Sequence, residues 1–295
     1  MNSAAPVGVI GLGLMGTALS ERLIDAGVPV IGFDIEPAAA AKLKAIGGAL
    51  AASVRELAGR CRTILVAVYD GTQVEALFDE IEGGAGPARP AVICTTTCTP
   101  DEITRLARRA KAAGIALVEA PISGTSAELR AGTALALVAG EAAALDAVGA
   151  LLEILSPHSV RVGAVGNASR TKLAVNLILQ NNRAALAEGI AFAESLGLDG
   201  RAFLAAARQS AAYSRVMDTK GEKMLTRDFR PQSHIAQTLK DAELILAEAR
   251  RLDLPLPMTA TQADLLRAAI ALAGPDSDSA AVIEAIRRPA TSEVR

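Results

Sequence analysis

Residues 7–16 read Val7-Gly8-Val9-Ile10-Gly11-Leu12-Gly13-Leu14-Met15-Gly16 and decide the fold of the first half of this chain. A short apolar run enters a Gly-x-Gly-x-x-Gly turn, and a helix-compatible segment follows as far as Ala26. Gly11 permits the tight turn, Gly13 lets the backbone approach a pyrophosphate, and Gly16 allows the helix to pack against the strand. Because the free N–H groups and the positive dipole end of the helix face that turn, residues 11–16 predict a dinucleotide-binding site.

Asp34 ends the second apolar run, Val28 to Phe33. It follows the glycines at about the 20-residue spacing at which an acid typically bonds the adenosine ribose. A carboxylate there would repel a 2′-phosphate, and no arginine follows it, so the sequence favours NAD; Lys42 or Lys44 leaves NADP possible. The alternative is a glycine-rich turn that binds no ligand, with Asp34 as a solvated carboxylate at the end of a strand. That interpretation leaves the strand, the glycine-rich turn, the helix and the acid as four unrelated features.

Composition describes a globular protein with no attraction for nucleic acid or membranes. The 295 residues are 51% hydrophobic and 21% charged, with a net charge of −2 and no block of Lys or Arg. No apolar stretch reaches the ~18 to 20 residues that span a bilayer. The start of the chain lacks a basic segment, so we expect no signal or transit peptide. Cys61, Cys94 and Cys98 lack metal-site spacing and predict reduced thiols in a cytoplasmic protein, with no metal site.

Apolar runs and helical segments alternate as far as about residue 165. Further strands are expected at 62–68, 91–95, 115–118, 133–139 and 159–162, and helices at 37–47, 71–81, 100–113 and 142–155. This alternation predicts an α/β fold, a Rossmann-type doubly wound parallel sheet with helices on both faces. Ligands of such a sheet bind at the carboxyl ends of its strands.

From Asn167 onward the periodicity is helical only. A long segment to about Leu196 would run ~45 Å as a helix. Later helices are expected at 201–212, 231–251, 258–272 and 279–286. We therefore expect a dinucleotide-binding domain at 1–165 and an all-helical domain at 166–295, joined by a long interdomain helix.

Lys172 and Asn176 are the most informative polar residues of this half. A separation of four places them on one face of the long helix, one turn apart. A buried lysine with a lowered pKa can exchange a proton with a hydroxyl or carbonyl group. An ordinary exposed Lys/Asn pair has the same spacing, so spacing alone leaves both interpretations open.

Four separated motifs make nearly the whole chain resemble the β-hydroxyacid dehydrogenase family, the group of 3-hydroxyisobutyrate dehydrogenase. They are Gly11-Leu12-Gly13-Leu14-Met15-Gly16, Thr96-Thr97-Cys98-Thr99-Pro100, Ala120-Pro121-Ile122-Ser123-Gly124 continuing to Gly132-Thr133, and Gly163-x-x-Gly166-x5-Lys172-x3-Asn176; Lys240-Asp241 is a fifth. Their order and spacing are far more specific than any one of them.

The resemblance implies an enzyme that transfers a hydride between NAD and a small β-hydroxy acid. It implies Lys172 as the catalytic acid/base and Asn176 as its orienting neighbour. It also implies substrate binding at Ser123, Gly124 and Thr125, and cofactor binding at residues 11–16, Asp34, Thr97 and Lys240. Helical halves of the family commonly associate, which implies a homodimer or homotetramer.

Two departures leave the substrate open. Thr125 stands where many members of the family have a second glycine, and Ser233 stands where an aromatic residue usually precedes the Lys-Asp pair. The alternatives are a glyoxylate or succinic semialdehyde reductase, an imine reductase, and a catalytically silent dinucleotide-binding module. Lys172 argues against the last two, because an imine reductase usually replaces this lysine and a silent module would be expected to lose it or Ser123.

Overall fold

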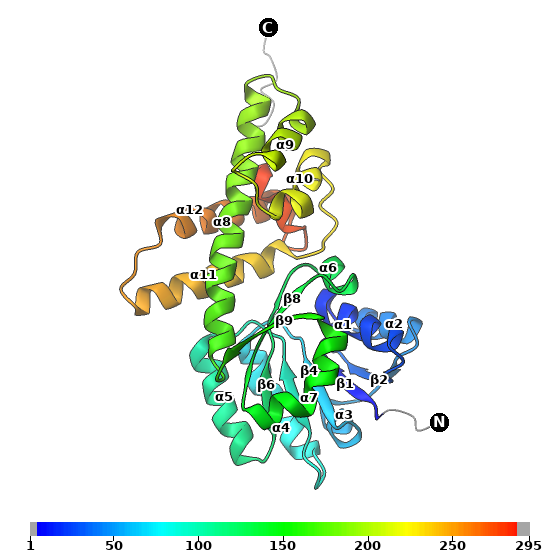
Figure 1. Cartoon of the computed structure of the whole chain (residues 1–295). Helices are drawn as coiled ribbons and strands as arrows, with labels where there is room; N and C mark the ends of the chain where they lie inside the picture. The colour runs from blue at the N-terminus through cyan, green and yellow to red at the C-terminus, as the bar shows by residue number, and fades with distance from the viewer. Residues whose placement is uncertain (1–4, 288–295) are drawn as a thin grey trace. The chain divides into compact units, whose positions relative to one another are not determined.

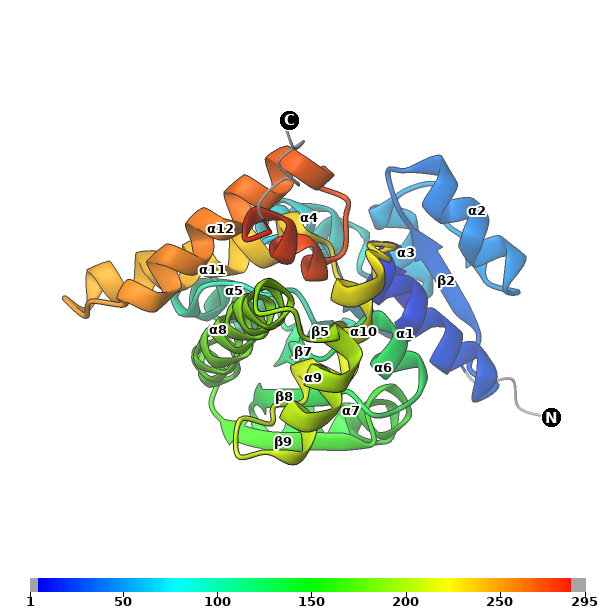
Figure 2. The same cartoon turned by 90° about the horizontal axis from the view of Figure 1, so that it is seen from above.

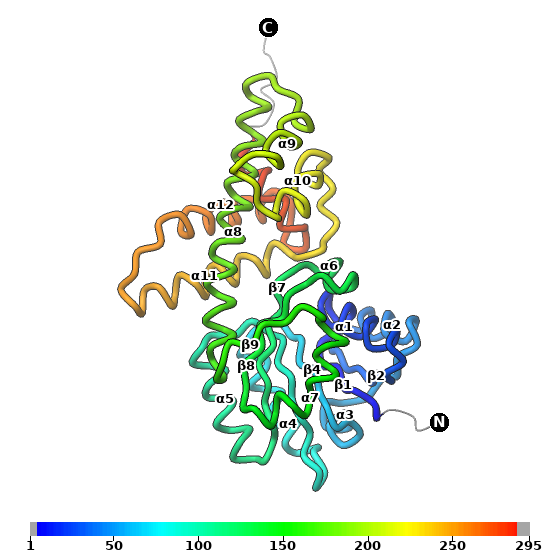
Figure 3. Tube along the Cα trace, viewed as in Figure 1, coloured from blue at the N-terminus to red at the C-terminus, as the bar shows by residue number. Residues whose placement is uncertain are grey.

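A computed structural model describes residues 5–287 of the chain. It divides into two compact units, Met1–Lys172 and Leu173–Arg295. We call the first the Rossmann unit and the second the helical unit, and describe each by itself. Figure 1 labels most elements of both, and Figure 3 follows the same path as a trace.

One mixed sheet organises the Rossmann unit. Its strands are β1 (Val7–Ile10), β2 (Val30–Phe33), β3 (Ala49–Leu50), β4 (Thr63–Val66), β5 (Ala91–Cys94), β6 (Ala116–Glu119), β7 (Ile122–Ser123), β8 (Leu135–Gly140) and β9 (His158–Gly163). The order is β3-β2-β1-β4-β5-β6-β8-β7, with β9 paired to β8. The first six strands are parallel in the 3-2-1-4-5-6 order of a dinucleotide-binding fold, whose strand order reverses beside β1.

Helices cover both faces of this sheet, as the sequence predicts. They are α1 (Leu14–Asp25), α2 (Pro37–Ala45), α3 (Val54–Arg60), α4 (Gly71–Gly84), α5 (Pro100–Ala112), α6 (Ser126–Arg130) and α7 (Ala142–Leu155). Alternate strand residues point to opposite faces. Val9 and Leu65 therefore pack with α1 and α7, whereas Ile64 and Val66 pack with α3, α4 and α5. The doubly wound fold class is confirmed.

The last strands depart from the expected all-parallel pairing. Strand β8 runs antiparallel to both β6 and β7, and β9 then pairs parallel with β8. Strand β7 continues from β6 in the same direction after Ala120 and Pro121, and the chain reverses only through the segment that contains α6, so β8 returns antiparallel to both strands.

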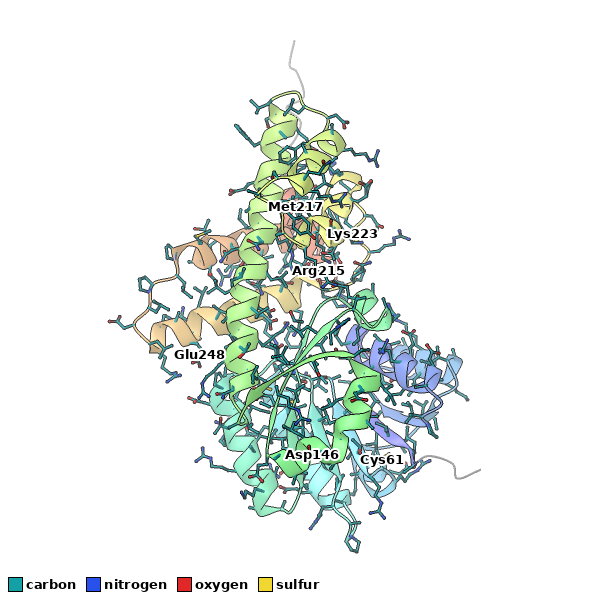
Figure 4. The ribbon with its side chains drawn as sticks, in the orientation of Figure 1. Cys61, Asp146, Arg215, Met217, Lys223 and Glu248 are labelled. Atoms are coloured by element: carbon teal, nitrogen blue, oxygen red, sulfur yellow. The ribbon has the colours of Figure 1, made fainter. Side chains whose placement is uncertain are left out.

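The helical unit is built around α8 (Asn167–Ser195), whose first residues lie in the Rossmann unit. The other elements are α9 (Gly200–Gln209), α10 (Val216–Thr226), α11 (Ile235–Arg251), α12 (Pro257–Ala273) and the 3-10 helix η1 (Ser279–Ala285). Helices α11 and α12 run side by side (Figure 2). Met217 of α10, labelled in Figure 4, is buried in the core that joins α8 to η1.

Several expected elements have different bounds or types. The sequence predicted a helix from residue 231, but α11 starts at Ile235 because Ile235 N–H donates to the Ser277 carbonyl. The last expected helix is a 3-10 helix. Elements β3, α3, β7, α6 and α10 were not predicted.

No helix within residues 5–287 combines the length and apolar character needed to cross a bilayer. Over the same residues, no group of three or more His, Cys, Asp or Glu side chains is arranged to hold a metal ion. All three cysteines are free and buried.

Candidate functional site

The glycine-rich turn has the shape that its sequence predicts. Gly11 has φ +88°, a conformation that side chains rarely adopt, and a Cβ on Gly16 would lie 1.8 Å from the Gly11 carbonyl oxygen. Gly13 is the residue before α1, and a Cβ on it would meet nothing within 4 Å. The open side of the turn therefore leaves room for a phosphate group at the start of α1, beside β1, and these residues fit a dinucleotide.

Asp34 is held at this turn. Its Oδ2 accepts a hydrogen bond from Leu12 N–H at 2.5 Å, and its Oδ1 accepts one from Glu36 N–H at 2.8 Å. The bond to Leu12 joins the end of β2 to the glycine-rich turn. In a dinucleotide-binding fold, an acid at the end of the second strand is the kind of group that binds ribose hydroxyls.

The candidate substrate loop follows β6. Ser123 is half-buried. Gly124 has φ +150°, and a Cβ added to it would lie only 3.0 Å from Ala134 Cβ, so a larger residue would be crowded there. Thr125 is the N-cap of α6: its hydroxyl accepts from Glu128 N–H, while Glu128 Oε2 accepts from Thr125 N–H. The hydroxyl of Thr125 is thus engaged in a capping box, which fixes the loop that carries Ser123. Thr97 lies half-buried in the loop between β5 and α5.

Glu119, at the end of β6, anchors the start of α8. Its side chain is 1% exposed. Oε2 accepts from Gly166 N–H at 2.8 Å, and Oε1 accepts from Ser169 N–H at 2.6 Å and from the Ser169 hydroxyl. A carboxylate at a helix N-terminus satisfies free N–H groups and complements the dipole. Ser169, which this carboxylate binds, lies three residues before Lys172.

Lys172 is 6% exposed in the second turn of α8. This burial excludes the exposed-pair interpretation that its spacing left open.

Asn176, one turn further along α8, is 4% exposed. Its Nδ2 donates to Asp241 Oδ2 of α11 at 2.9 Å, whereas its Oδ1 has no hydrogen-bond partner. Lys240 lies beside this pair, with Nζ 3.0 Å from Asp241 Oδ1. The fifth motif, Lys240-Asp241, is therefore joined to Asn176 within the helical unit.

Two family models together span most of the chain. The NAD binding domain of 6-phosphogluconate dehydrogenase matches residues 6–166, and the NAD-binding domain of NADP-dependent 3-hydroxyisobutyrate dehydrogenase matches residues 166–286. The chain belongs to the β-hydroxyacid dehydrogenase family. The predicted family is thus confirmed, and with it an NAD(P)-dependent oxidoreductase acting on CH–OH groups.

Members of the β-hydroxyacid dehydrogenase family resemble the chain over almost its full length. It is 32% identical to 2-hydroxy-3-oxopropionate reductase of Escherichia coli, over 95% of this chain and 96% of that protein. It is 30% identical to L-threonate dehydrogenase of Cupriavidus necator, over 94% of each. The solved 3-hydroxyisobutyrate dehydrogenase of Salmonella typhimurium superposes with a TM-score of 0.86 at 27% identity, covering 95% of this chain and 99% of that one.

Sequence reasoning missed Arg183 and Gln180 and gave Glu119 no role. Arg183 is 6% exposed and Gln180 is 3% exposed, both on α8. A signal was present, because Asn176, Gln180 and Arg183 follow the i, i+4, i+7 spacing of one helix face. An arginine on such a face within an apolar helix is unusual enough to be singled out.

Proposed function

We propose that the chain catalyses reversible hydride transfer between NAD and a small β-hydroxy acid, with Lys172 as the general acid/base. The observation that carries this proposal is the burial of Lys172 to 6% exposure, four residues before the buried Asn176. The glycine-rich turn supports the cofactor assignment, and the Asp34 carboxylate supports NAD over NADP.

The roles follow from the chemistry of each group. A nicotinamide supplies a hydride acceptor at C4 when it is bound. In the oxidative direction, the neutral amine of Lys172 takes the hydroxyl proton as the carbonyl forms, and in reduction the ammonium returns it. Asn176 orients the reacting oxygen, and its unpartnered Oδ1 can accept a hydrogen bond. Ser123 and the Gly124 backbone bind the carboxylate, while Thr97 and Lys240 contact the cofactor.

A substrate panel tests this proposal. It contains 3-hydroxyisobutyrate, 3-hydroxypropionate, serine and L-threonate, read as NADH or NADPH formation, and 2-hydroxy-3-oxopropionate, read as consumption. L-threonate is taken from the name of a related dehydrogenase, and 2-hydroxy-3-oxopropionate from the name of a related reductase. We expect turnover of at least one compound, with kcat/KM higher for NAD(H) than for NADP(H). No turnover of any compound contradicts the proposal, and a preference for NADP(H) contradicts the role of Asp34.

We also propose a homodimer or homotetramer that works in the cytoplasm. Large apolar side chains of the helical unit are exposed, among them Ile178, Phe192 and Leu272. Contact with a second copy would remove such side chains from water. Three buried free thiols suit a reducing compartment. Light scattering on the purified chain should give a mass of two or four copies, and a monomer at micromolar concentration contradicts the assembly.

A further inference from the structure

Buried polar atoms without a hydrogen-bond partner are concentrated in the helical unit. Over the described part of the chain, they are Asn176 Oδ1, Gln180 Oε1, Arg183 Nε and Nη1, Asp241 Oδ1 and Gln262 Oε1. Buried polar groups are nearly always paired, so each such atom calls for a ligand, a water molecule or another explanation. Arg183 differs from the others because it has two such atoms, both donors, whereas the charged oxygen of Asp241 lies 3.0 Å from Lys240 Nζ.

The position of Arg183 relates it to Asn176. The two residues are seven apart on α8, which places them on the same face two turns apart, with Gln180 between them. Helical side chains generally lean toward the N-terminus of their helix, which for Arg183 is the direction of Asn176. The charge of Asp241, which accepts a hydrogen bond from Asn176, also acts on the Arg183 guanidinium. Gln180 is fixed in place, because its Nε2 donates to the Thr238 carbonyl at 3.2 Å.

The buried charges of this region leave Arg183 without a counterion of its own. Lys220 Nζ donates to Asp278 at 2.7 and 2.9 Å, and Lys240 lies 3.0 Å from Asp241. Each of these pairs is neutral as a whole. Arg183 therefore remains as a buried cation beside two ion pairs whose opposite charges already cancel.

Arg183 stays charged despite this burial. Loss of hydration lowers its pKa to about 10, and the negative charges of Asp278 and Asp241 oppose that effect. At neutral pH the helical unit consequently holds a permanent positive charge with unused N–H donors. Such a charge is unfavourable in the ligand-free chain and becomes favourable when an anion approaches it.

We propose that Arg183 is a specificity-determining residue that binds a second carboxylate, at the far end of the substrate. The preferred substrate class is then a β-hydroxy acid with two carboxylates. Guanidinium and carboxylate form strong charge-assisted hydrogen bonds, which suits a site that must select a dianion over a monoanion. This inference rests on the proposed function, because it takes Asn176 as the neighbour of the reacting oxygen.

The first test uses thermal unfolding of the wild-type chain with NADH present. Glutarate supplies two carboxylates and butyrate supplies one, at matched ionic strength. A ligand that binds only the folded chain raises the Tm. We expect glutarate to raise the Tm and butyrate to have a much smaller effect. Equal effects of the two acids overturn the proposal without any variant having to fold.

The second test compares Arg183→Met with Arg250→Met, a control that removes an exposed arginine near the end of α11. Arg183→Met should abolish the glutarate shift and raise the Tm of the ligand-free chain, because an unmatched buried charge is gone. Its kcat/KM should fall about 100-fold for 3-hydroxyglutarate and less than about 3-fold for 3-hydroxypropionate, a loss typical of a charged hydrogen-bond partner. Arg250→Met should change none of these.

The outcomes separate the two proposals. If Arg183→Met lowers the Tm and leaves the ratio of the two substrates unchanged, Arg183 is a structural residue bridged by internal water, and this inference fails. If wild-type chain binds glutarate through Arg183 but oxidises no hydroxy acid, the proposed function fails and the binding site stands.

Discussion

In the Rossmann unit the buried carboxylate of Glu119 accepts hydrogen bonds at both oxygens, whereas in the helical unit the buried guanidinium of Arg183 has two nitrogens without a partner. Every buried side-chain atom without a partner, among those the structure describes, belongs to residues 176–262. A buried group whose hydrogen bonds are all satisfied stabilises the ligand-free fold. A buried group with unsatisfied donors or acceptors is suited to bind a ligand. Replacing a fully bonded group such as Glu119 or Asp278 should therefore lower stability, whereas replacing Arg183 should raise the stability of the ligand-free chain.

The largest loss should follow Asp278→Asn, which breaks the matched ion pair of the helical unit. Lys220 and Asp278 are 2% and 0% exposed, and removal of one partner from such a pair costs about 3–5 kcal/mol of unfolding free energy. Urea unfolding measures this loss. An unchanged midpoint would show that loss of the Asp278 charge leaves Lys220 without penalty, and would contradict the importance of paired buried charges.

The same pair predicts a pH dependence. Burial raises the pKa of Asp278, but Lys220 and the N–H groups of Gln232 and Ala280 outweigh it, so the net pKa is below the usual value. Its stabilising contribution is then complete above the unfolded pKa of 3.8 and is lost as the pH falls through the lower folded value. Asp278→Asn should flatten the acid limb of the unfolding curve.

A smaller loss is expected from Glu119→Gln. The amide places an N–H₂ group where the carboxylate accepted from Gly166 or Ser169, so a buried donor loses its partner at a cost of about 1–3 kcal/mol. Because Lys172 lies one turn beyond Ser169, kcat should also fall while the affinity for NADH stays constant. Urea unfolding and steady-state kinetics check the two parts. Full stability with wild-type kcat would show that α8 needs no such anchor.

The smallest effect should come from Arg201→Ala, which removes an exposed ion pair between α9 and α10. Arg201 and Glu222 are 68% and 53% exposed, and solvent screens pairs of this kind. We expect no measurable change in the urea midpoint. A clear fall in the urea midpoint would mean that exposed ion pairs contribute to the stability of the helical unit. The effect of Asp278→Asn could then not be assigned to the burial of its pair.

The sequence predicted the doubly wound fold because its signals are local. The turn at Gly11 and the alternation of strands with helices are visible within about 30 residues. Short elements were missed for the same reason: β3 has two residues, both exposed, and leaves no apolar pattern. The polarity of α10 hid it in a similar way, since the buried Lys220 is paired with Asp278, which lies 58 residues later.

The candidate site was predictable only where a motif names its residues. The motifs identified Lys172, Asn176 and the glycines, and the structure added that Lys172 is buried. Glu119 and Arg183 could not be assigned roles, because these depend on what packs against them. Gly166 follows Glu119 by 47 residues, and Asp278 comes long after Arg183.

Lys172→Ala provides the most direct test of the central claim, that a buried amine on α8 transfers the substrate proton. NADH affinity measured by fluorescence titration should stay near the wild-type value, while kcat for the best hydroxy acid of the panel should fall by about 10²–10⁴, the contribution of a general acid/base. Wild-type kcat in this variant, with NADH bound normally, would contradict the role of Lys172 and the mechanism built on it.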